Sequence, residues 1–392
     1  MITPKPGILI LNDTSVFAGT EQYIFLLAGS LRNAGENVSI ACLDDSPLAL
    51  RLRAAGQAVV PVCPAPLNVH AYKVAAKLLR EGAIQILHAN NGRTAMFATL
   101  AVTLAGSGRI VMTQHFLEPC YVTRRGIKAK LSNIMHRWVD RRTDHLIAIS
   151  EATSRGAIAR GEAKPEGITV IPNGTAPPDR SALRAIRAVR EELGFEQGIP
   201  LVVCAARLEP EKDVATLIEA MALVVRQFPT AVCVVAGEGR LRNELQERIS
   251  GLGLERSVRL LGFRTDVMSI VNASDLFVLP SVAEPFGLVL VEAMSLGKPV
   301  VAIAAGGPLE IVEHGRTGLL VPPQNPQEMA AAIGQLLTSP ETRDEMGSRG
   351  ESKYRGEFTV ERMTEQTIGV YRRVLAEPAS HRADAVANSV SA

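Results

Sequence analysis

Residues 276–294, which read L-F-V-L-P-S-V-A-E-P-F-G-L-V-L-V-E-A-M, are the clearest indication of the fold. The first four residues, Leu276 to Leu279, form a short and continuously apolar run, which is typical of a strand buried on both faces. Pro285 and Gly287 then predict a tight loop, and the apolar spacing after them predicts a helix that begins near Gly287. The stretch therefore predicts the strand–loop–helix unit of an α/β protein.

The same rhythm of short apolar runs and longer amphipathic runs extends in both directions. We expect strands in the first half at 7–11, 38–43, 58–62, 84–88, 110–114 and 145–149, with helices between them such as 21–34 and 69–81. We expect strands in the second half at 201–205, 232–236, 258–261, 276–279, 300–303 and 319–321. Strands that alternate with helices predict parallel sheets covered on both faces, which is a doubly wound α/β fold.

A proline- and glycine-containing run at 172–178 predicts a linker between two halves. We therefore expect two doubly wound, Rossmann-like domains, at 1–175 and 176–359, which face each other across a deep cleft. A helix at about 360–377 is expected to pack back on the first domain, and the tail at 378–392 is expected to be disordered. Ligands of such sheets bind beyond the carboxyl ends of the strands, so the site is expected in the cleft.

Composition excludes some classes of protein. The chain has 392 residues, of which 47% are hydrophobic and 21% charged, so wholesale disorder is excluded. The net charge is +2, the difference between 42 basic and 40 acidic residues, which is too small for a typical nucleic-acid-binding protein. The charge is uneven, because residues 1–175 carry 19 basic and 12 acidic residues, which suggests that the two halves face different partners.

The cysteines and the N-terminus bear on the compartment. The five cysteines form no C-x-x-C pair and are Cys42, Cys63, Cys120, Cys204 and Cys233. Three of them, Cys42, Cys204 and Cys233, lie in apolar runs, which predicts buried thiols in a reducing compartment. The sequence shows no export signal and no apolar run long enough to span a bilayer. We therefore expect a cytoplasmic protein, or one bound to a membrane from the cytoplasmic side.

Two glutamates flank the predicted loop and helix start. Glu284 precedes the helix and Glu292 lies about one turn inside it. Free backbone N–H groups at a helix start bind anions, so a phosphate group is a natural ligand here. The alternative is that the acids only compensate the helix dipole. Two acids around a proline and a glycine favour a binding site.

Two cations follow the strand at 201–205. Arg207 and Lys212 are five residues apart across a predicted turn, so both can converge on one phosphate. The alternative is a pair of solvated surface charges. The planar guanidinium of Arg207 and the point charge of Lys212 suit a phosphate ligand. The chain contains no D-x-D motif, which fits chemistry that requires no metal ion.

Other strand ends carry weaker candidates. Gly19 opens the first helix, where a small residue lets the backbone approach a phosphate, although an ordinary helix start is equally consistent. His115 follows the strand at 110–114, and His88 ends the strand before it, where it is expected to line the cleft. A lone histidine is more often structural than catalytic, but a carboxyl-end position favours a site.

In the second half, the turn at Gly237 and Glu238 again follows a strand and is a candidate binding turn, with a plain β–α turn as the alternative. The backbone beside Phe263 and Arg264, after the strand at 258–261, is a further candidate contact, and the turn at 306–310 is expected to line the same pocket.

The run from Glu284 to Glu292 resembles the E-x7-E motif of retaining glycosyltransferases with the GT-B fold. The resemblance extends over nearly the whole chain. It implies that Glu284 contacts the donor sugar, that Glu292 contacts the ribose, and that Arg207 and Lys212 form the R-x4-K clamp on the pyrophosphate. It also implies that His115 contacts the donor sugar near its reacting face.

The resemblance assigns further donor contacts. The loop residue Phe286 belongs to the motif, and the backbone N–H groups after it, on Gly287, Leu288 and Val289, would face the pyrophosphate. A G-x-G turn near the nucleobase corresponds to Gly237 and Glu238. The family usually has two glycines where this chain has Ala18 and Gly19, so phosphate contact there would fall to Gly19.

The implied reaction is metal-independent transfer of a sugar, with retention, from a nucleotide-diphosphate sugar to a glycan or lipid-linked acceptor, as in cell-surface polysaccharide or glycolipid synthesis. A nucleotide-sugar epimerase and a non-catalytic nucleotide-sugar-binding protein are the alternatives. The donor base, the sugar and the acceptor are left open.

A basic segment at 123–142 carries seven cations against one acid, with apolar residues and Trp138 at helical spacing. Such a helix can lie on an anionic membrane. The alternative is a packed helix with a solvated basic face.

Overall fold

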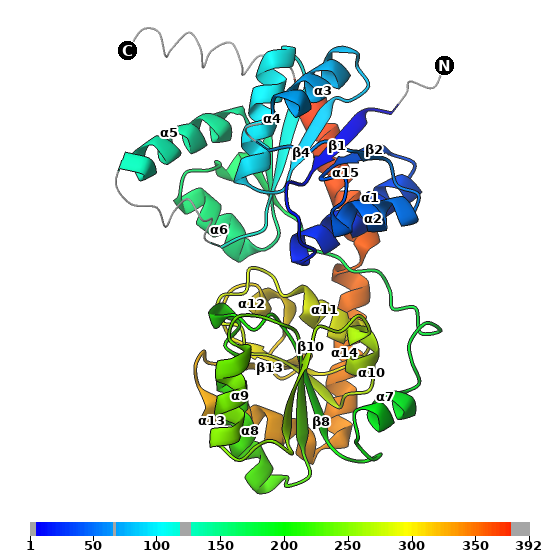
Figure 1. The fold of residues 1–392 in the computed structure, drawn as a ribbon, viewed down its shortest axis with the longest axis vertical. Helices are drawn as coiled ribbons and strands as arrows, with labels where there is room; N and C mark the ends of the chain where they lie inside the picture. Colours follow the sequence, from blue (N-terminus) through cyan, green and yellow to red (C-terminus); the bar gives the residue numbers. More distant parts are fainter. Residues whose placement is uncertain (1–4, 66–67, 118–126, 378–392) are drawn as a thin grey trace. The chain divides into compact units, whose positions relative to one another are not determined.

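The computed structural model describes residues 5–65, 68–117 and 127–377, and within 127–134 it describes only the backbone. The chain forms two compact units and passes between them twice, at Asn173/Gly174 and again at Thr359/Val360. The sequence places the first boundary two residues later, at 175. Each unit contains one sheet in which every paired strand is parallel, as predicted (Figure 1).

The first unit contains a seven-stranded sheet in the order β3-β2-β1-β4-β5-β6-β7. Its strands are β1 (Gly7–Leu11), β2 (Asn37–Ala41), β3 (Val59–Val60), β4 (Ile86–Ala89), β5 (Arg109–Gln114), β6 (His145–Ala148) and β7 (Ile168–Val170). Its helices are α1 (Gly19–Asn33), α2 (Pro47–Ala54), α3 (Val69–Arg80), α4 (Gly92–Ala105), α5 (Ile127–Arg142), α6 (Glu151–Ala159) and the last helix of the chain, α15 (Val360–Ala376). The strand expected at 58–62 shrinks to two residues because Pro61 has no N–H for the ladder.

Helices cover both faces of this sheet. Ile8 and Ile10 of β1 pack with α1 and α15 on one face, whereas Leu9 and Leu11 pack with α3 and α4 on the other. Val374 of α15 belongs to the same buried cluster as Ile10, so the last helix of the chain completes the core of its first unit (Figure 1). Continuously apolar strands are what such a doubly covered sheet requires.

The second unit contains a six-stranded sheet in the order β10-β9-β8-β11-β12-β13. Its strands are β8 (Leu201–Ala205), β9 (Val232–Ala236), β10 (Val258–Gly262), β11 (Leu276–Leu279), β12 (Val300–Ile303) and β13 (Gly318–Val321). Its helices are α7 (Ile186–Glu192), α8 (Val214–Gln227), α9 (Arg242–Gly251), α10 (Val267–Asn272), α11 (Leu288–Ser295), α12 (Pro308–Ile311), α13 (Pro326–Thr338) and α14 (Pro340–Glu357).

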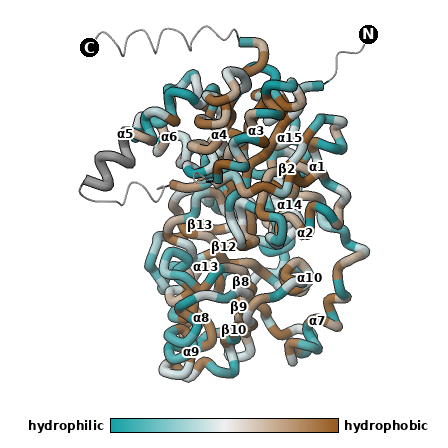
Figure 2. The backbone as a smooth tube through the Cα atoms, turned by 45° about the horizontal axis from the view of Figure 1, so that its top comes forward, coloured by the Kyte–Doolittle hydropathy of each residue, from teal (hydrophilic) through white to brown (hydrophobic). Residues whose placement is uncertain are grey.

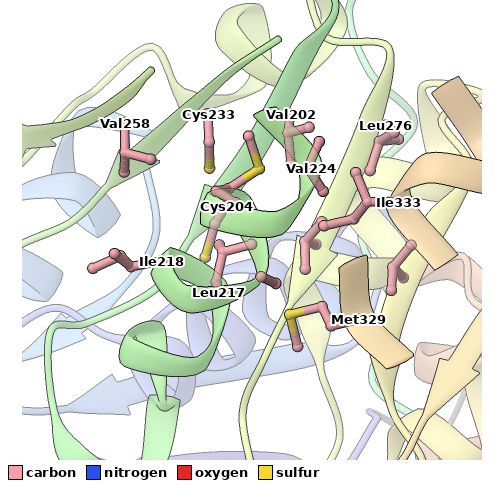
Figure 3. Close-up of a cluster of buried hydrophobic side chains, with 14 of the residues drawn as sticks. Val202, Cys204, Leu217, Ile218, Val224, Cys233, Val258, Leu276, Met329 and Ile333 are labelled. Atoms are coloured by element: carbon pink, nitrogen blue, oxygen red, sulfur yellow. The ribbon is translucent and has the colours of Figure 1, made fainter. Parts of the chain in front are cut away.

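One core of the second unit lies between its sheet and the helices α8 and α13. Cys204, Cys233, Leu217 and Ile333 are fully buried there and belong to one hydrophobic cluster (Figure 3). Burial raises the pKa of the Cys204 thiol to about 12, so it behaves as a small apolar side chain. The prediction of buried thiols is confirmed for this pair and for Cys42, while Cys63 is half-buried and Cys120 lies outside the described residues.

Hydrophobic residues are concentrated in the buried strands, and hydrophilic residues in the surface helices. Figure 2 shows hydrophobic colours along β8 and β9 and mostly hydrophilic colours along the surface helix α9. In the part of the chain that the structure describes, no helix combines the length and the apolar character that crossing a bilayer requires.

Candidate active site

The loops at the carboxyl edge of the second sheet are joined to one another by backbone hydrogen bonds. The bonds run from Ala206 N to Ala236 O (3.1 Å), Leu208 N to Glu238 O (2.9 Å), Gly237 N to Gly262 O (2.8 Å), Val282 N to Glu211 O (3.0 Å) and Gly307 N to Glu284 O (2.9 Å). They connect the loops that follow β8, β9, β10, β11 and β12. Because backbone atoms make these contacts, the predicted donor-binding residues sit on a rigid edge rather than on independent loops.

Gly237 is required by this close approach of loops. A Cβ atom at position 237 would lie 1.9 Å from the backbone oxygen of Ala206, which is an impossible contact. Gly237 therefore lets the loop after β9 pack directly on the loop after β8, which carries Arg207. Its structural role is clear from these contacts, whatever ligand the turn binds.

Lys212 and Glu284 form an ion pair at this edge. The Nζ atom of Lys212 lies 2.6 Å from Oε2 of Glu284, and the two side chains are only 16% and 12% exposed. Lys212 ends a short 3-10 turn, Pro210–Lys212, and the next residue, Asp213, has a left-handed φ of 44°. Asp213 in turn accepts a hydrogen bond from Thr216 Oγ1 at 2.7 Å, which holds the turn that presents Lys212.

Arg207 has a different partner. Its Nη2 atom donates a hydrogen bond of 2.7 Å to Oε1 of Glu211, and its side chain is 60% exposed. Both predicted phosphate-binding cations are thus paired with carboxylates. Glu211 is a site residue that was not predicted, although its position four residues after Arg207 is a signal for such a pair.

Glu292 lies inside α11, which begins after Gly287. Gly287 is the N-cap residue, with φ 109° and ψ 52°, and no side chain caps the first turn. Burial raises the pKa of the Glu292 carboxyl to about 7, so this acid is partly protonated near neutral pH. A half-buried carboxyl one turn from an uncapped helix start combines a hydroxyl acceptor with an anion-binding terminus.

Leu288 and Val289, whose N–H groups are predicted to face a pyrophosphate, open α11 and are half-buried. The Phe286 side chain is 3% exposed and packs edge-on against Phe358, so it anchors the loop to the protein interior. Phe263 is 73% exposed.

Two other predicted donor-site residues are engaged in ion pairs. Arg264 contacts Asp266 at 2.8 Å and Glu192 at 2.9 Å, and these carboxylates raise its pKa. Glu238 pairs with Arg242 at 3.1 Å. The side chains of Arg264 and Glu238 are therefore held in ion pairs within the protein, whereas their backbone groups are not part of these pairs.

The predicted residues of the first unit lie at the carboxyl edge of its own sheet. Gly19 is the first residue of α1, and its Cα faces open space. Glu21 caps this helix start by accepting a hydrogen bond of 2.9 Å from Ala18 N. His115 follows β5, is 7% exposed, and lies with Nε2 3.2 Å from Oδ1 of Asn90.

His88 is not the lining residue that its position predicted. It is fully buried, and both ring nitrogens have partners: Nδ1 lies 2.5 Å from the hydroxyl of Tyr371 and Nε2 lies 2.7 Å from Oγ1 of Thr113. Burial lowers its pKa to about 3. The expectation was wrong because Tyr371, from the last helix of the chain, covers this strand end.

Comparisons with known proteins agree with this architecture. Residues 17–177 match the family model described as Glycosyltransferase Family 4, and residues 185–353 match the model described as Glycosyl transferases group 1. The two models cover the two units in turn.

Individual relatives extend the match. Alpha-D-kanosaminyltransferase of Streptomyces kanamyceticus is 33% identical over 198 residues, so the alignment spans half of the length of each chain. GDP-mannose-dependent monoacylated alpha-(1-6)-phosphatidylinositol monomannoside mannosyltransferase of Corynebacterium glutamicum is 28% identical over 325 residues, which are 78% of this chain and 80% of the relative.

A solved structure matches nearly the whole chain. Anabaena Alr3699/HepE in complex with UDP-glucose superposes with a TM-score of 0.80 and 28% sequence identity, covering 94% of this chain and 99% of the other. Two parallel-sheet units, two consecutive family models and this full-length superposition agree. The chain therefore belongs to the glycosyltransferases with the GT-B fold, with a family 4 unit followed by a group 1 unit.

Proposed function

We propose that the protein transfers a sugar, with retention of anomeric configuration and without a metal ion, from a nucleoside-diphosphate sugar to a hydroxyl of a glycan or lipid-linked acceptor. The observation that carries the proposal is the ion pair between Lys212 and Glu284 at 2.6 Å, on loops joined by backbone hydrogen bonds. A cation for the diphosphate and a carboxylate for sugar hydroxyls are thereby held side by side.

The donor assignment is supported by charge and by backbone geometry. Lys212 and Arg207 lie on the short loop after β8. The uncapped start of α11 follows β11, which is the neighbour of β8 in the sheet. A helix start binds anions, and the two cations add the positive charge that a departing diphosphate needs. The matched Anabaena structure contains UDP-glucose, which is the same class of ligand.

The proposed step exchanges one bond for another on the same face of the sugar. The acceptor oxygen bonds to the anomeric carbon, the bond from that carbon to the phosphate oxygen breaks, and the acceptor proton passes to the departing phosphate. Glu284 is held by Lys212, so its proposed role is to accept hydrogen bonds from sugar hydroxyls. The chain's contribution is then orientation and electrostatic stabilisation.

Metal-independent catalysis is proposed because Arg207 and Lys212, on one loop, can supply the positive charge that a diphosphate requires. Lys212 supplies a point charge and Arg207 a planar fork. Activity that survives a chelator supports this part of the proposal, and activity restored only by added divalent cation contradicts it.

A lipid-linked acceptor is proposed from two observations. The Corynebacterium relative is named for a phosphatidylinositol mannoside acceptor. The basic segment 123–142 has the composition of a membrane-surface helix, although only part of it lies among the described residues. We accordingly propose action at the cytoplasmic face of a membrane, in cell-surface polysaccharide or glycolipid synthesis.

A donor screen tests the proposal. The protein is incubated with UDP, GDP and ADP sugars, with and without lipid-linked acceptors, and release of nucleoside diphosphate is measured. Acceptor-dependent release by the wild-type protein that is lost in Glu284→Ala supports a transferase. Conversion of the donor sugar without acceptor would indicate an epimerase, and binding without turnover would indicate a non-catalytic protein.

A further inference from the structure

Asn90 is a fully buried side chain at the carboxyl edge of the first sheet, and it connects three segments there. Its backbone N–H donates to Oγ1 of Thr94 at 3.0 Å, and its Nδ2 atom donates to the backbone oxygen of Leu11 at 3.2 Å. Its Oδ1 atom lies 3.2 Å from Nε2 of His115. A buried amide with all these partners has one orientation available to it.

The contact with Leu11 determines that orientation. A backbone carbonyl oxygen can only accept a hydrogen bond, so the amide atom that faces Leu11 must be the NH2 group of Asn90. The amide oxygen therefore faces His115. Because that oxygen can also only accept, the hydrogen must lie on Nε2 of His115.

The surroundings keep the His115 ring neutral. The Tyr23 ring packs edge-on against it, with 4.7 Å between ring centroids. Burial, with a smaller contribution from the nearby His88, lowers the pKa of His115 to about 3. A neutral ring with its hydrogen on Nε2 carries a bare lone pair on Nδ1, and in the described part of the chain no hydrogen bond to that atom is found.

We propose that Asn90 is a positioning residue that fixes His115 in the Nε2–H tautomer and thereby leaves Nδ1 as a hydrogen-bond acceptor for a hydroxyl group of the sugar substrate. The tautomer is an inference from the hydrogen bonds alone, and only the identity of the hydroxyl rests on the proposed function. A bare imidazole nitrogen attracts an O–H group and repels an oxyanion. His115 is therefore matched to sugar hydroxyls and not to the diphosphate.

Replacement of Asn90 by aspartate changes this arrangement without changing the shape of the side chain. The carboxylate still faces Nε2, but it favours the positively charged imidazolium, and it can no longer donate to Leu11. His115 in Asn90→Asp then gains a hydrogen on Nδ1 and becomes a donor. The nearly isosteric Asn90→Leu removes the acceptor altogether, so that neither tautomer is preferred.

Long-range proton–nitrogen NMR of the full chain, with 15N-labelled histidine, tests the proposal. The chain has seven histidines, and the spectrum of His115→Gln assigns the relevant one. We expect a protonated Nε2 and an unprotonated Nδ1 in the wild-type protein from about pH 8 to about pH 5, a range in which a free histidine titrates. In Asn90→Asp we expect His115 to protonate within this range, and kcat to fall about tenfold, as for loss of one hydrogen bond to a charged or polar group.

Thr94→Val is the matched control, because Thr94 bonds the Asn90 backbone and not its amide. It should leave the His115 tautomer unchanged. A hydrogen on Nδ1 of His115 in the wild-type protein, or an unaltered His115 titration in Asn90→Asp, overturns the proposal. The readout needs no turnover, so absence of transferase activity alongside the expected tautomer would refute the proposed function and leave this inference standing.

Discussion

Lys212 Nζ lies 2.6 Å from Glu284 Oε2, although the two residues are 72 positions apart in the sequence. The contact exists because β8 and β11 are neighbours in the second sheet, so the loops after them meet at one edge. Removing one partner of a largely desolvated pair leaves the other charge uncompensated. The pair therefore links stability to the proposed chemistry.

Lys212→Ala should reduce both stability and turnover. The unpaired Glu284 carboxylate is expected to lower the free energy of unfolding by about 2 kcal/mol. Loss of the cation that faces the leaving diphosphate is expected to lower kcat about 100-fold. Urea unfolding and nucleoside-diphosphate release measure the two effects. Arg240→Ala is the control, since Arg240 pairs with Glu209 on the same edge but is 68% exposed, and an equal loss of activity in it would contradict a specific role for Lys212.

Glu211→Gln should strengthen donor binding. In the structure Glu211 holds Arg207 at 2.7 Å, so a diphosphate must compete with this carboxylate for the guanidinium. An exposed pair of this kind is worth at most about 1 kcal/mol, which corresponds to a decrease of at most about fivefold in the Kd for nucleoside diphosphate. Titration calorimetry measures this change in Kd. Glu191→Gln is the control, because Glu191 forms its ion pair with Arg187 on α7. Weaker binding by Glu211→Gln would mean that Glu211 orients Arg207 instead of competing for it.

Glu292 should make stability depend on pH. Burial raises its pKa in the folded protein to about 7, above its ordinary value of 4.5. The folded state then holds the proton more tightly than the unfolded state, so the stability that this group contributes is present below pH 4.5 and is lost as the pH rises through 7. The Tm of Glu292→Gln should match that of the wild-type protein at low pH and exceed it increasingly toward pH 8. A Tm difference that is constant with pH would show that Glu292 does not titrate in this interval.

Gly237→Ala should be severely destabilising. The added Cβ would lie 1.9 Å from the Ala206 oxygen, so the loops after β8 and β9 must separate, at a cost of about 3 kcal/mol. Gly251→Ala is the matched control, because no atom lies within 4 Å of its added Cβ and its position in α9 favours alanine by about 1 kcal/mol. Urea unfolding of both variants measures the contrast, and a Gly237→Ala protein of wild-type stability would contradict the packing described for this edge.

The sequence predicted the sheets well because both are buried on two faces and their strands are continuously apolar. It missed β7 (Ile168–Val170), a short edge strand whose three residues are only half-buried and therefore carry little hydrophobic signal. The structure and the sequence thus differ mainly at the edges of the sheets, where burial no longer dictates composition.

The candidate site was predictable in its residues but not in their pairing. Lys212 and Glu284 each follow a strand and could be identified by position. Their contact depends on the strand order β9-β8-β11, which no local pattern encodes. Tyr371 illustrates the same limit, since it reaches His88 from 283 residues away and makes that histidine structural.

Proton NMR of the complete reaction tests the central claim most directly. An α-linked nucleoside-diphosphate sugar is followed with acceptor and wild-type protein, and in parallel with Lys212→Ala. We predict an α-linked product and nucleoside diphosphate in equal amounts, and loss of both in the variant. A β-linked product, or unchanged turnover in Lys212→Ala, would contradict the account.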